Sequence, residues 1–255
     1  MKMASTEHNV SGNAPAGRKR FWKQADVVPE GQGFVVQLDG RSIRLPRKTP
    51  LCVTSRALAD ALAAEWQAAG QNADGRFSPA DLPFTGIAGS MIERIPAERE
   101  GVLRSLLAYA GSDLLCYREP GEGKLAQAQR KEWGPWLEWL CKQYGAILHT
   151  SSGVMPIVQP EESLQKLYDA MEKLNPAELA VLAVSVPALG SLVLGLALVN
   201  GAGSVDDLVA SATLDERMQM AVWGEDTEIT DRIAGIQREV ADAARFLELA
   251  RKPVA

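Results

Sequence analysis

Hydrophobic and polar positions alternate along the N-terminal third of the chain in a way that predicts strands. Two β-prone runs, residues 34–38 and 41–45, flank the dipeptide Asp39-Gly40. This dipeptide tolerates the positive φ angles of a tight type I′ turn, so we expect a β-hairpin here. Residues 50–54 form a candidate third strand, which Pro50 favours at a sheet edge because proline cannot donate a ladder hydrogen bond.

Helical spacing replaces this alternation further along the chain. Ser55 is a suitable N-cap for a helix whose apolar positions are Leu58, Leu62 and Trp66. From about residue 82 onward the pattern is almost entirely helical. Further helix starts are indicated by prolines and capping residues at Pro96, Pro160, Asn175 and Ser204, the last leading towards Leu214 and Met218. A helix over residues 124–144 contains Gly134-Pro135, which is expected to start, kink or break it.

These patterns predict an α+β fold with two parts. Residues 1–19 are expected to form a flexible tail, and residues 20–85 a small β-rich N-terminal domain with one covering helix. Residues 86–255 are expected to form a larger all-helical C-terminal domain. Its last segment, residues 228–252, mixes apolar and charged positions as an amphipathic surface helix does.

Residues 179–205 contain no charged side chain, and two structures could explain this. A membrane span is one of them. Pro187 and Gly190 interrupt the stretch, however, and Asp206-Asp207 follow it where a basic cluster would be expected. A buried pair of helices at the centre of the helical part is therefore favoured.

Composition and net charge limit the classes of function that the chain can have. Hydrophobic residues make up 46% of the 255, which is typical of a soluble globular protein and argues against disorder. The formal net charge is -5, from 27 Lys and Arg against 32 Asp and Glu. This argues against a general nucleic-acid binder, because phosphate neutralisation needs a basic surface.

Residues that carry chemistry are sparse. The chain has three widely spaced cysteines, Cys52, Cys116 and Cys141, and this odd number predicts reduced thiols rather than disulfides. Because it has only two histidines, we expect no metal site. Nucleotide-binding and hydrolase motifs are absent, so we expect no cofactor and no enzyme activity. The alternative is an enzyme that uses His149 or Cys116 in a cleft between domains.

Two features stand out from this background. Trp133, Trp136 and Trp139 recur at intervals of three, which favours core packing, with an aromatic groove for a partner as the alternative. Residues 214–226 place carboxylates on both sides of a helical stretch that bears Met and Trp. Such a stretch is usually a solvated helix face, but it also suits a binder of a basic, partly unfolded protein.

Several short phrases occur in an order that resembles one family. They are Arg20-Phe21-Trp22-Lys23, Leu38-Asp39-Gly40-Arg41, Ala64-Glu65-Trp66, Leu82-Pro83-Phe84-Thr85, Ser112-Asp113-Leu114-Leu115-Cys116-Tyr117-Arg118, residues 133–139, Ser191-Leu192-Val193-Leu194 and residues 214–225. Together they resemble the alpha-subunit-binding assembly chaperones of the F-type ATP synthase over roughly residues 20–245.

The resemblance implies a chaperone without catalytic residues. Such a protein binds the unassembled alpha subunit and shields the surface that the beta subunit later covers. The resemblance assigns partner binding to the last block, with Asp215 and Glu216 contacting the client or organising the domain, and Gln219, Trp223 and Glu225 beside them. Trp66 is expected to be structural.

The remaining expectations concern partners and location. The alpha subunit is the expected partner, without nucleic acid or stable membrane insertion, and the chain is expected to be monomeric. Residues 1–20 have no apolar signal core and a poor transit-peptide composition. We therefore expect the cytoplasm of a bacterium, or the mitochondrial matrix if the source is eukaryotic. Membrane association through residues 179–205 stays a rival interpretation.

Overall fold

The N-terminal part is an antiparallel sheet covered by a helix. The computed structural model describes residues 17–152 and 156–252. Its four-stranded sheet consists of β2 (Ala25–Glu30), β3 (Gly33–Leu38), β4 (Arg41–Ser42) and β5 (Cys52–Val53). β3 is central and pairs with each of the others. Asp39 and Gly40 have φ angles of 47° and 78°, so the predicted tight turn between β3 and β4 is confirmed.

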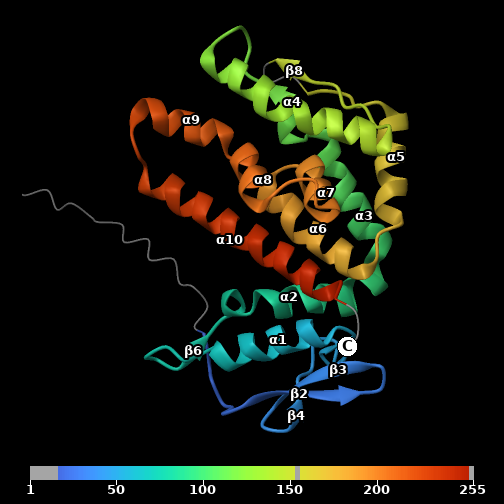
Figure 1. Cartoon of the computed structure of the whole chain (residues 1–255), viewed down its shortest axis with the longest axis vertical. Helices are drawn as coiled ribbons and strands as arrows, with labels where there is room; N and C mark the ends of the chain where they lie inside the picture. The colour runs from blue at the N-terminus through green and yellow to red at the C-terminus, as the bar shows by residue number, and fades with distance from the viewer. Residues whose placement is uncertain (1–16, 153–155, 253–255) are drawn as a thin grey trace, which may run out of the picture.

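One helix lies on this sheet and connects it to the rest of the molecule. α1 (Arg56–Ala68) begins at Ser55, whose hydroxyl accepts a hydrogen bond from the Leu58 N–H at 3.3 Å, as predicted. The same hydroxyl donates to the carbonyl of Leu249 near the C-terminus at 2.7 Å. In Figure 1 the sheet, α1, α2 (Pro83–Gly89) and α10 (Thr227–Ala250) follow one another from the bottom upwards.

The start of the described chain is more ordered than the sequence predicted. Arg18 and Lys19, expected in a flexible tail, form β1 (Arg18–Lys19) and pair with β6 (Arg76–Phe77). The Arg20 side chain, which follows β1, donates to the carbonyls of Gln67 and Ala69 at the end of α1 and so holds this segment against the helix. Residues 1–16 of the predicted tail lie outside the described residues.

The C-terminal part is mostly helical, whereas the sequence predicted it to be all-helical. Its helices are η2 (Ser90–Arg94, a π-helical turn), α3 (Ile95–Gly111), α4 (Lys124–Tyr144), α5 (Glu161–Glu172), α6 (Pro176–Leu189), α7 (Leu192–Asn200), α8 (Val205–Ala212), α9 (Leu214–Trp223) and α10. Short turns η1 (Pro79–Asp81) and η3 (Leu114–Cys116) and a parallel pair of strands, β7 (Tyr117–Arg118) and β8 (Ser151–Ser152), complete the described chain. The predicted α+β class is therefore confirmed.

The two parts share one hydrophobic core. Buried side chains form a single cluster that runs from Trp22 in the N-terminal part to Leu249 in α10. α2 crosses the expected boundary between residues 85 and 86 and continues through η2 into α3. The division into separate domains stays a prediction.

α6 and α7 occupy the centre of the helical part. Every residue of α7 from Leu192 to Val199 is buried, and α6 packs against α2, α3, α7 and α10. The uncharged stretch is therefore a buried helix pair, as favoured from sequence. Within the described ranges, 17–152 and 156–252, no helix is both long and apolar enough to cross a membrane.

One helix differs from its sequence prediction, and another agrees with it. α4 runs unbroken through Pro135, because this residue is exposed and water can satisfy the carbonyl that its ring leaves unpaired. α10 agrees with its prediction as an amphipathic surface helix, because Val240, Ala243 and Phe246 in its C-terminal half are buried against α6 and neighbouring helices while Arg245 and Glu248 are exposed.

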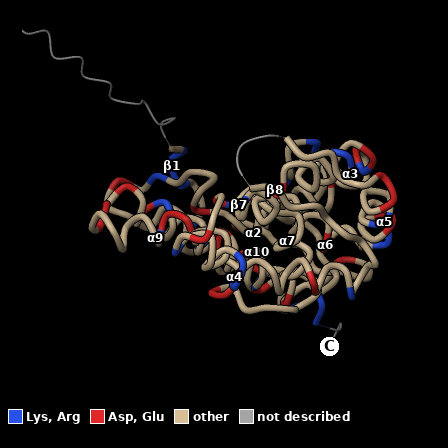
Figure 2. Tube along the Cα trace, turned by 90° about the horizontal axis from the view of Figure 1, so that it is seen from above, with Lys and Arg blue, Asp and Glu red and all other residues tan. Residues whose placement is uncertain are grey.

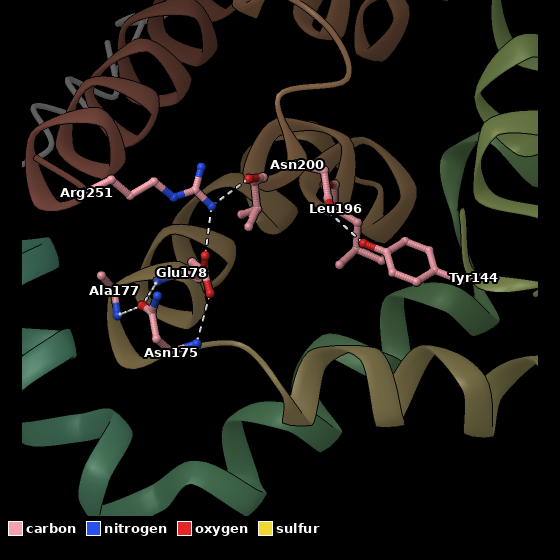
Figure 3. Close-up of polar contacts among 8 residues, drawn as sticks. Tyr144, Asn175, Ala177, Glu178, Leu196, Asn200 and Arg251 are labelled. Carbon is pink, nitrogen blue, oxygen red and sulfur yellow. Dashed lines mark hydrogen bonds and ion pairs between the residues drawn. The ribbon is translucent and has the colours of Figure 1, made fainter. Parts of the chain in front are cut away.

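The end of α10 is held by polar contacts shown in Figure 3. The Arg251 guanidinium donates to the Glu178 carboxylate at 2.8 Å and to the Val199 carbonyl at 2.9 Å. The other Glu178 oxygen accepts from the Asn175 N–H and completes the predicted capping box of α6. Arg251 therefore connects the start of α6 and the end of α7 to the C-terminal helix.

The phrases that suggested a family meet one another in pairs. The Glu65 carboxylate accepts from the N–H groups of Phe84 and Thr85 at 2.6 and 2.9 Å and so caps α2, while the Trp66 indole donates to the Thr85 hydroxyl. Asp39 likewise accepts from the N–H of Lys23. Trp66 thus has a structural role, and these two pairs of phrases hold the N-terminal part together.

A buried carboxylate joins another pair of phrases. Asp113 accepts hydrogen bonds from the Ser191 hydroxyl at 2.8 Å and from the N–H groups of Leu115 and Val193, both at 3.1 Å. It therefore fixes η3 to the first turn of α7. Burial raises the pKa of Asp113 to about 6, although these hydrogen bonds favour the ionised form.

We expect Asp113→Asn to change the pH dependence of stability. The folded chain keeps a proton on Asp113 where the unfolded chain, with an ordinary pKa of about 4, has lost it. The contribution of Asp113 to stability therefore falls as the pH rises from about 4 to about 6. The variant should lack this fall and should lose about 1–3 kcal/mol at neutral pH, because its amide N–H₂ faces the donor N–H of Val193.

Urea unfolding of wild type and variant across this pH range tests the prediction. Asp231→Asn, on the exposed part of α10, is the matched control and should leave the pH profile unchanged. A profile that is the same for Asp113→Asn and wild type would mean that Asp113 does not titrate in this range.

Candidate partner-binding site

The residues predicted to bind a partner lie on a projecting pair of helices. α9 and the first half of α10 run side by side in opposite directions and extend away from the other helices in Figure 1. Gly224 between them has a φ of 97°, which only glycine adopts readily, and Asp226 caps α10 by accepting from the Glu228 N–H at 2.9 Å. The local sequence therefore specifies this α9–α10 hairpin.

The tip of the hairpin is apolar and open to solvent. Val222 is 70% exposed and Trp223 is 83% exposed. Two adjacent large apolar side chains are left uncovered at the end of a helix, next to a turn. Exposed tryptophan is typical of interfaces, where it supplies much of the binding energy.

Acidic side chains surround this tip. In Figure 2, which colours the backbone trace by residue type, acidic positions (red) lie next to α9. Residues 213–232 contain six carboxylates and two arginines, namely Asp215, Glu216, Glu225, Asp226, Glu228 and Asp231 against Arg217 and Arg232. The hairpin therefore presents an apolar tip within a negative field, which favours a partner surface that is apolar with basic surroundings.

Asp215 lies at the base of the hairpin and contacts the protein itself. Its carboxylate accepts a hydrogen bond from the Gln129 side chain of α4 at 2.8 Å. Burial raises the pKa of Asp215, and repulsion from Glu216 and Glu119 adds to the rise. Of the two roles considered for it, this contact favours organisation of the domain.

Glu216 joins the two helices of the hairpin. It forms an ion pair with Arg232 of α10, and its side chain is about one-third exposed. Gln219 and Glu225 are exposed, as is Trp223. The structure thus brings the five predicted residues onto one hairpin, with Asp215 and Glu216 engaged internally and the other three facing solvent.

Sequence reasoning missed Val222 and the partners Gln129 and Arg232. A signal for Val222 was present, because Met218, Met220, Val222 and Trp223 cannot all face one buried stripe of a helix. Gln129 and Arg232 carry no local signal, since their roles arise only from the packing of α4 and α10 beside α9.

The tryptophan cluster belongs to the core and supports the hairpin. The Trp133 indole is buried and donates to the Ser211 carbonyl of α8 at 2.9 Å, and the Trp136 indole donates to the Ser211 hydroxyl at 2.8 Å. Trp139 packs edge-on against Tyr144. Core packing, the favoured interpretation, is confirmed.

Neither Cys116 nor His149, the residues of the enzyme alternative, belongs to a group of catalytic side chains in the described part of the chain. Cys116 is fully buried, and burial raises the pKa of its thiol to about 12, with the charge of Asp113 adding to this. Such a thiol stays protonated and is a poor nucleophile. His149 is exposed, and its backbone rather than its ring contacts Gln159. Across residues 17–152 and 156–252, no group of three or more His, Cys, Asp or Glu could hold a metal ion.

Comparison with known proteins defines the class of this molecule. The crystal structure of Atp12 from Paracoccus denitrificans superimposes with a TM-score of 0.81 and 35% sequence identity, over 91% of this chain and 98% of that one. The mitochondrial Atp12 proteins of Schizosaccharomyces pombe and Saccharomyces cerevisiae are 24% and 23% identical over 81% and 94% of this chain, and over 74% and 89% of their own lengths. The protein is therefore a chaperone.

The family can also be stated. The sequence profile of the ATP12 chaperone protein family matches residues 19–141. The chain belongs to the ATP12 family, which confirms the resemblance to ATP synthase assembly chaperones that its ordered phrases indicated.

Proposed function

We propose that this protein binds the unassembled alpha subunit of the F-type ATP synthase and shields its beta-facing interface until the beta subunit replaces it. The observation that carries the proposal is the exposed Val222-Trp223 tip on an acidic hairpin. An orphan alpha subunit exposes an apolar interface, and such a surface promotes aggregation. A temporary cap needs a small apolar contact that excludes water there.

The proposed exchange requires only that this chain and the beta subunit differ in their affinity for the alpha subunit. The chaperone must bind alpha less tightly than beta does, because exchange then proceeds without an energy source. A hairpin that offers two large apolar side chains suits a contact of limited area. We propose a bacterial cytoplasm as the compartment and a monomer as the active form.

The direct experiment mixes the purified chain with an isolated alpha subunit and follows the complex by size-exclusion chromatography. We expect a complex with alpha, no complex with an isolated beta subunit, and release of the chain when beta is added to the alpha complex. An alpha subunit that elutes alone, or a complex that forms only with beta, would contradict the proposed client.

Exchanging the two charges of the Glu216–Arg232 ion pair tests whether Glu216 positions the hairpin or contacts the alpha subunit directly. Glu216→Lys places a second cation beside Arg232, so the two helices should separate and alpha binding should weaken by about tenfold, equivalent to about 1.4 kcal/mol. Adding Arg232→Glu recreates the ion pair in reverse. We expect the double variant to recover most of the lost affinity, because Glu216 positions the hairpin.

Titration calorimetry with alpha measures all three proteins. Failure of the double variant to recover would instead assign Glu216 to direct contact with alpha. Unchanged binding of the single variant would remove Glu216 from the site.

A further inference from the structure

A second open surface lies in the N-terminal part, away from the hairpin. It is a cleft of about 990 Å³ between β4 with the loop after it and the helical face formed by α2 and η2. Arg18 of β1 and Phe77 of the paired strand β6 also line it. The cleft is large enough to hold several side chains of a peptide.

The floor of this cleft is apolar. Leu38, Ile43, Phe77 and Leu82, which are buried, and the partly buried Trp66 of α1 line it. At the rim, Phe21 is 78% exposed, with its ring edge-on to Trp22 at 5.1 Å. A floor of this kind favours aliphatic and aromatic side chains.

The rim is basic, although the whole chain is acidic. Five arginines and two glutamates line the cleft, namely Arg18, Arg41, Arg44, Arg47, Arg94, Glu93 and Glu98. Both glutamates are engaged, since Glu93 accepts from the N–H groups of Arg47 and Thr49 and Glu98 pairs with the Arg47 guanidinium at 2.5 Å. The excess of arginine here, on a chain of net charge -5, complements carboxylates on a ligand.

We infer that this cleft binds an extended segment of a partner protein in which apolar side chains are flanked by Asp or Glu. The inference rests on the proposed function, in that the partner is the client whose interface the hairpin covers. Apolar side chains of the segment would lie on the floor, and its carboxylates would meet the arginines at the rim. The chain's own residues 1–16 fit this description poorly, because they contain one carboxylate, Glu7, and no aromatic residue.

The helical face of the cleft allows a variant that fills it. A Cβ added at Gly86 of α2 would meet no atom within 4 Å, and one at Gly89 would reach only Leu45, at 3.6 Å. Gly86→Leu with Gly89→Leu should therefore occupy the cleft, and the fold should tolerate it because leucine favours a helix more than glycine does. Gly101→Leu, on the exposed face of α3 with no atom near its added Cβ, is the matched control.

Calorimetric titration with two synthetic peptides tests the inference. The first peptide alternates Phe and Leu with Asp and Glu, and the second carries Lys in place of the acids. We expect the acidic peptide to bind wild type and Gly101→Leu equally, to bind the filled variant at least tenfold more weakly, and to bind better than the basic peptide. Absence of binding, equal binding by the filled variant, or preference for the basic peptide would overturn the inference.

Two further measurements separate this inference from its alternatives. A chain without residues 1–16 should bind the acidic peptide as wild type does, and much tighter binding would mean that the N-terminal segment occupies the cleft instead. A chain with Val222→Ser and Trp223→Ser should also keep peptide binding. If wild type binds the peptide but no alpha subunit, the proposed client fails while the cleft assignment stands; if it binds alpha but no peptide, only the cleft assignment fails.

Discussion

A chain with Val222→Ser and Trp223→Ser is expected to bind an isolated alpha subunit at least about thirtyfold more weakly than wild type. Truncation of an interface tryptophan commonly costs about 2 kcal/mol or more of binding free energy, and each 1.4 kcal/mol is about tenfold in affinity. Both side chains lie at the hairpin tip and are largely exposed, so the loss should fall on binding rather than folding. The change in unfolding free energy should stay within about 0.5 kcal/mol.

The matched control is Val158→Ser, at a valine that is 88% exposed on the segment before α5. It removes apolar surface of the same kind away from the hairpin. Affinity should be measured by calorimetry, and stability by urea unfolding of the same samples. Equal affinity of the tip variant and the control would place the alpha contact elsewhere on the molecule.

The largest effect on stability is expected for Trp133→Ala, at about 3–5 kcal/mol. The indole is 1% exposed, and its N–H is the donor to the Ser211 carbonyl. Its loss leaves a cavity between α4 and α8 and removes a hydrogen bond. Because α8 leads through Thr213 into α9, the base of the hairpin should also loosen, and alpha binding should weaken together with stability.

Trp136→Phe is a milder substitution in the same cluster, with which Trp133→Ala can be compared. It keeps an aromatic ring but removes the bond to the Ser211 hydroxyl and the outer indole carbons that lie against Gly203, so a loss of about 1–2 kcal/mol is expected. Thermal and urea unfolding of both variants give the two losses. A Trp133→Ala loss no greater than that of Trp136→Phe would show that α8 is held by other contacts.

Local chemistry made much of the fold predictable. Asp39-Gly40 required a turn with two positive φ angles, and Ser55 and Asn175 marked helix starts because their side chains satisfy free N–H groups. The uncharged stretch around Leu194, interrupted by Pro187 and Gly190, favoured a buried helix pair over a membrane span, and α7 is buried. These features depend on a few neighbouring residues, so one sequence contains enough information to predict them.

The features of the fold that the sequence predicted wrongly depend on tertiary packing. Pro135 does not interrupt α4 because its side faces solvent while Trp133 and Trp136 fix the opposite side on α8. Pairing of Arg18 with Phe77 is equally non-local.

The candidate site was predictable in position and only partly in roles. The acidic block that contains Trp223 pointed to the hairpin, yet nothing in its spacing showed that Asp215 would contact Gln129 or that Glu216 would contact Arg232. Other family phrases identify contacts inside the fold, such as Glu65 with Thr85. Family likeness therefore identifies the chaperone more directly than it identifies the surface that binds a client.

The central claim is that the hairpin tip touches the alpha subunit, and site-specific photocrosslinking tests it most directly. Benzoylphenylalanine replaces Trp223 in one chain and Val158 in another, and each is irradiated with an isolated alpha subunit. We predict that position 223 crosslinks to alpha within its beta-facing surface, that added beta abolishes the product, and that position 158 gives none. Crosslinking from position 158 with none from position 223 would contradict this claim.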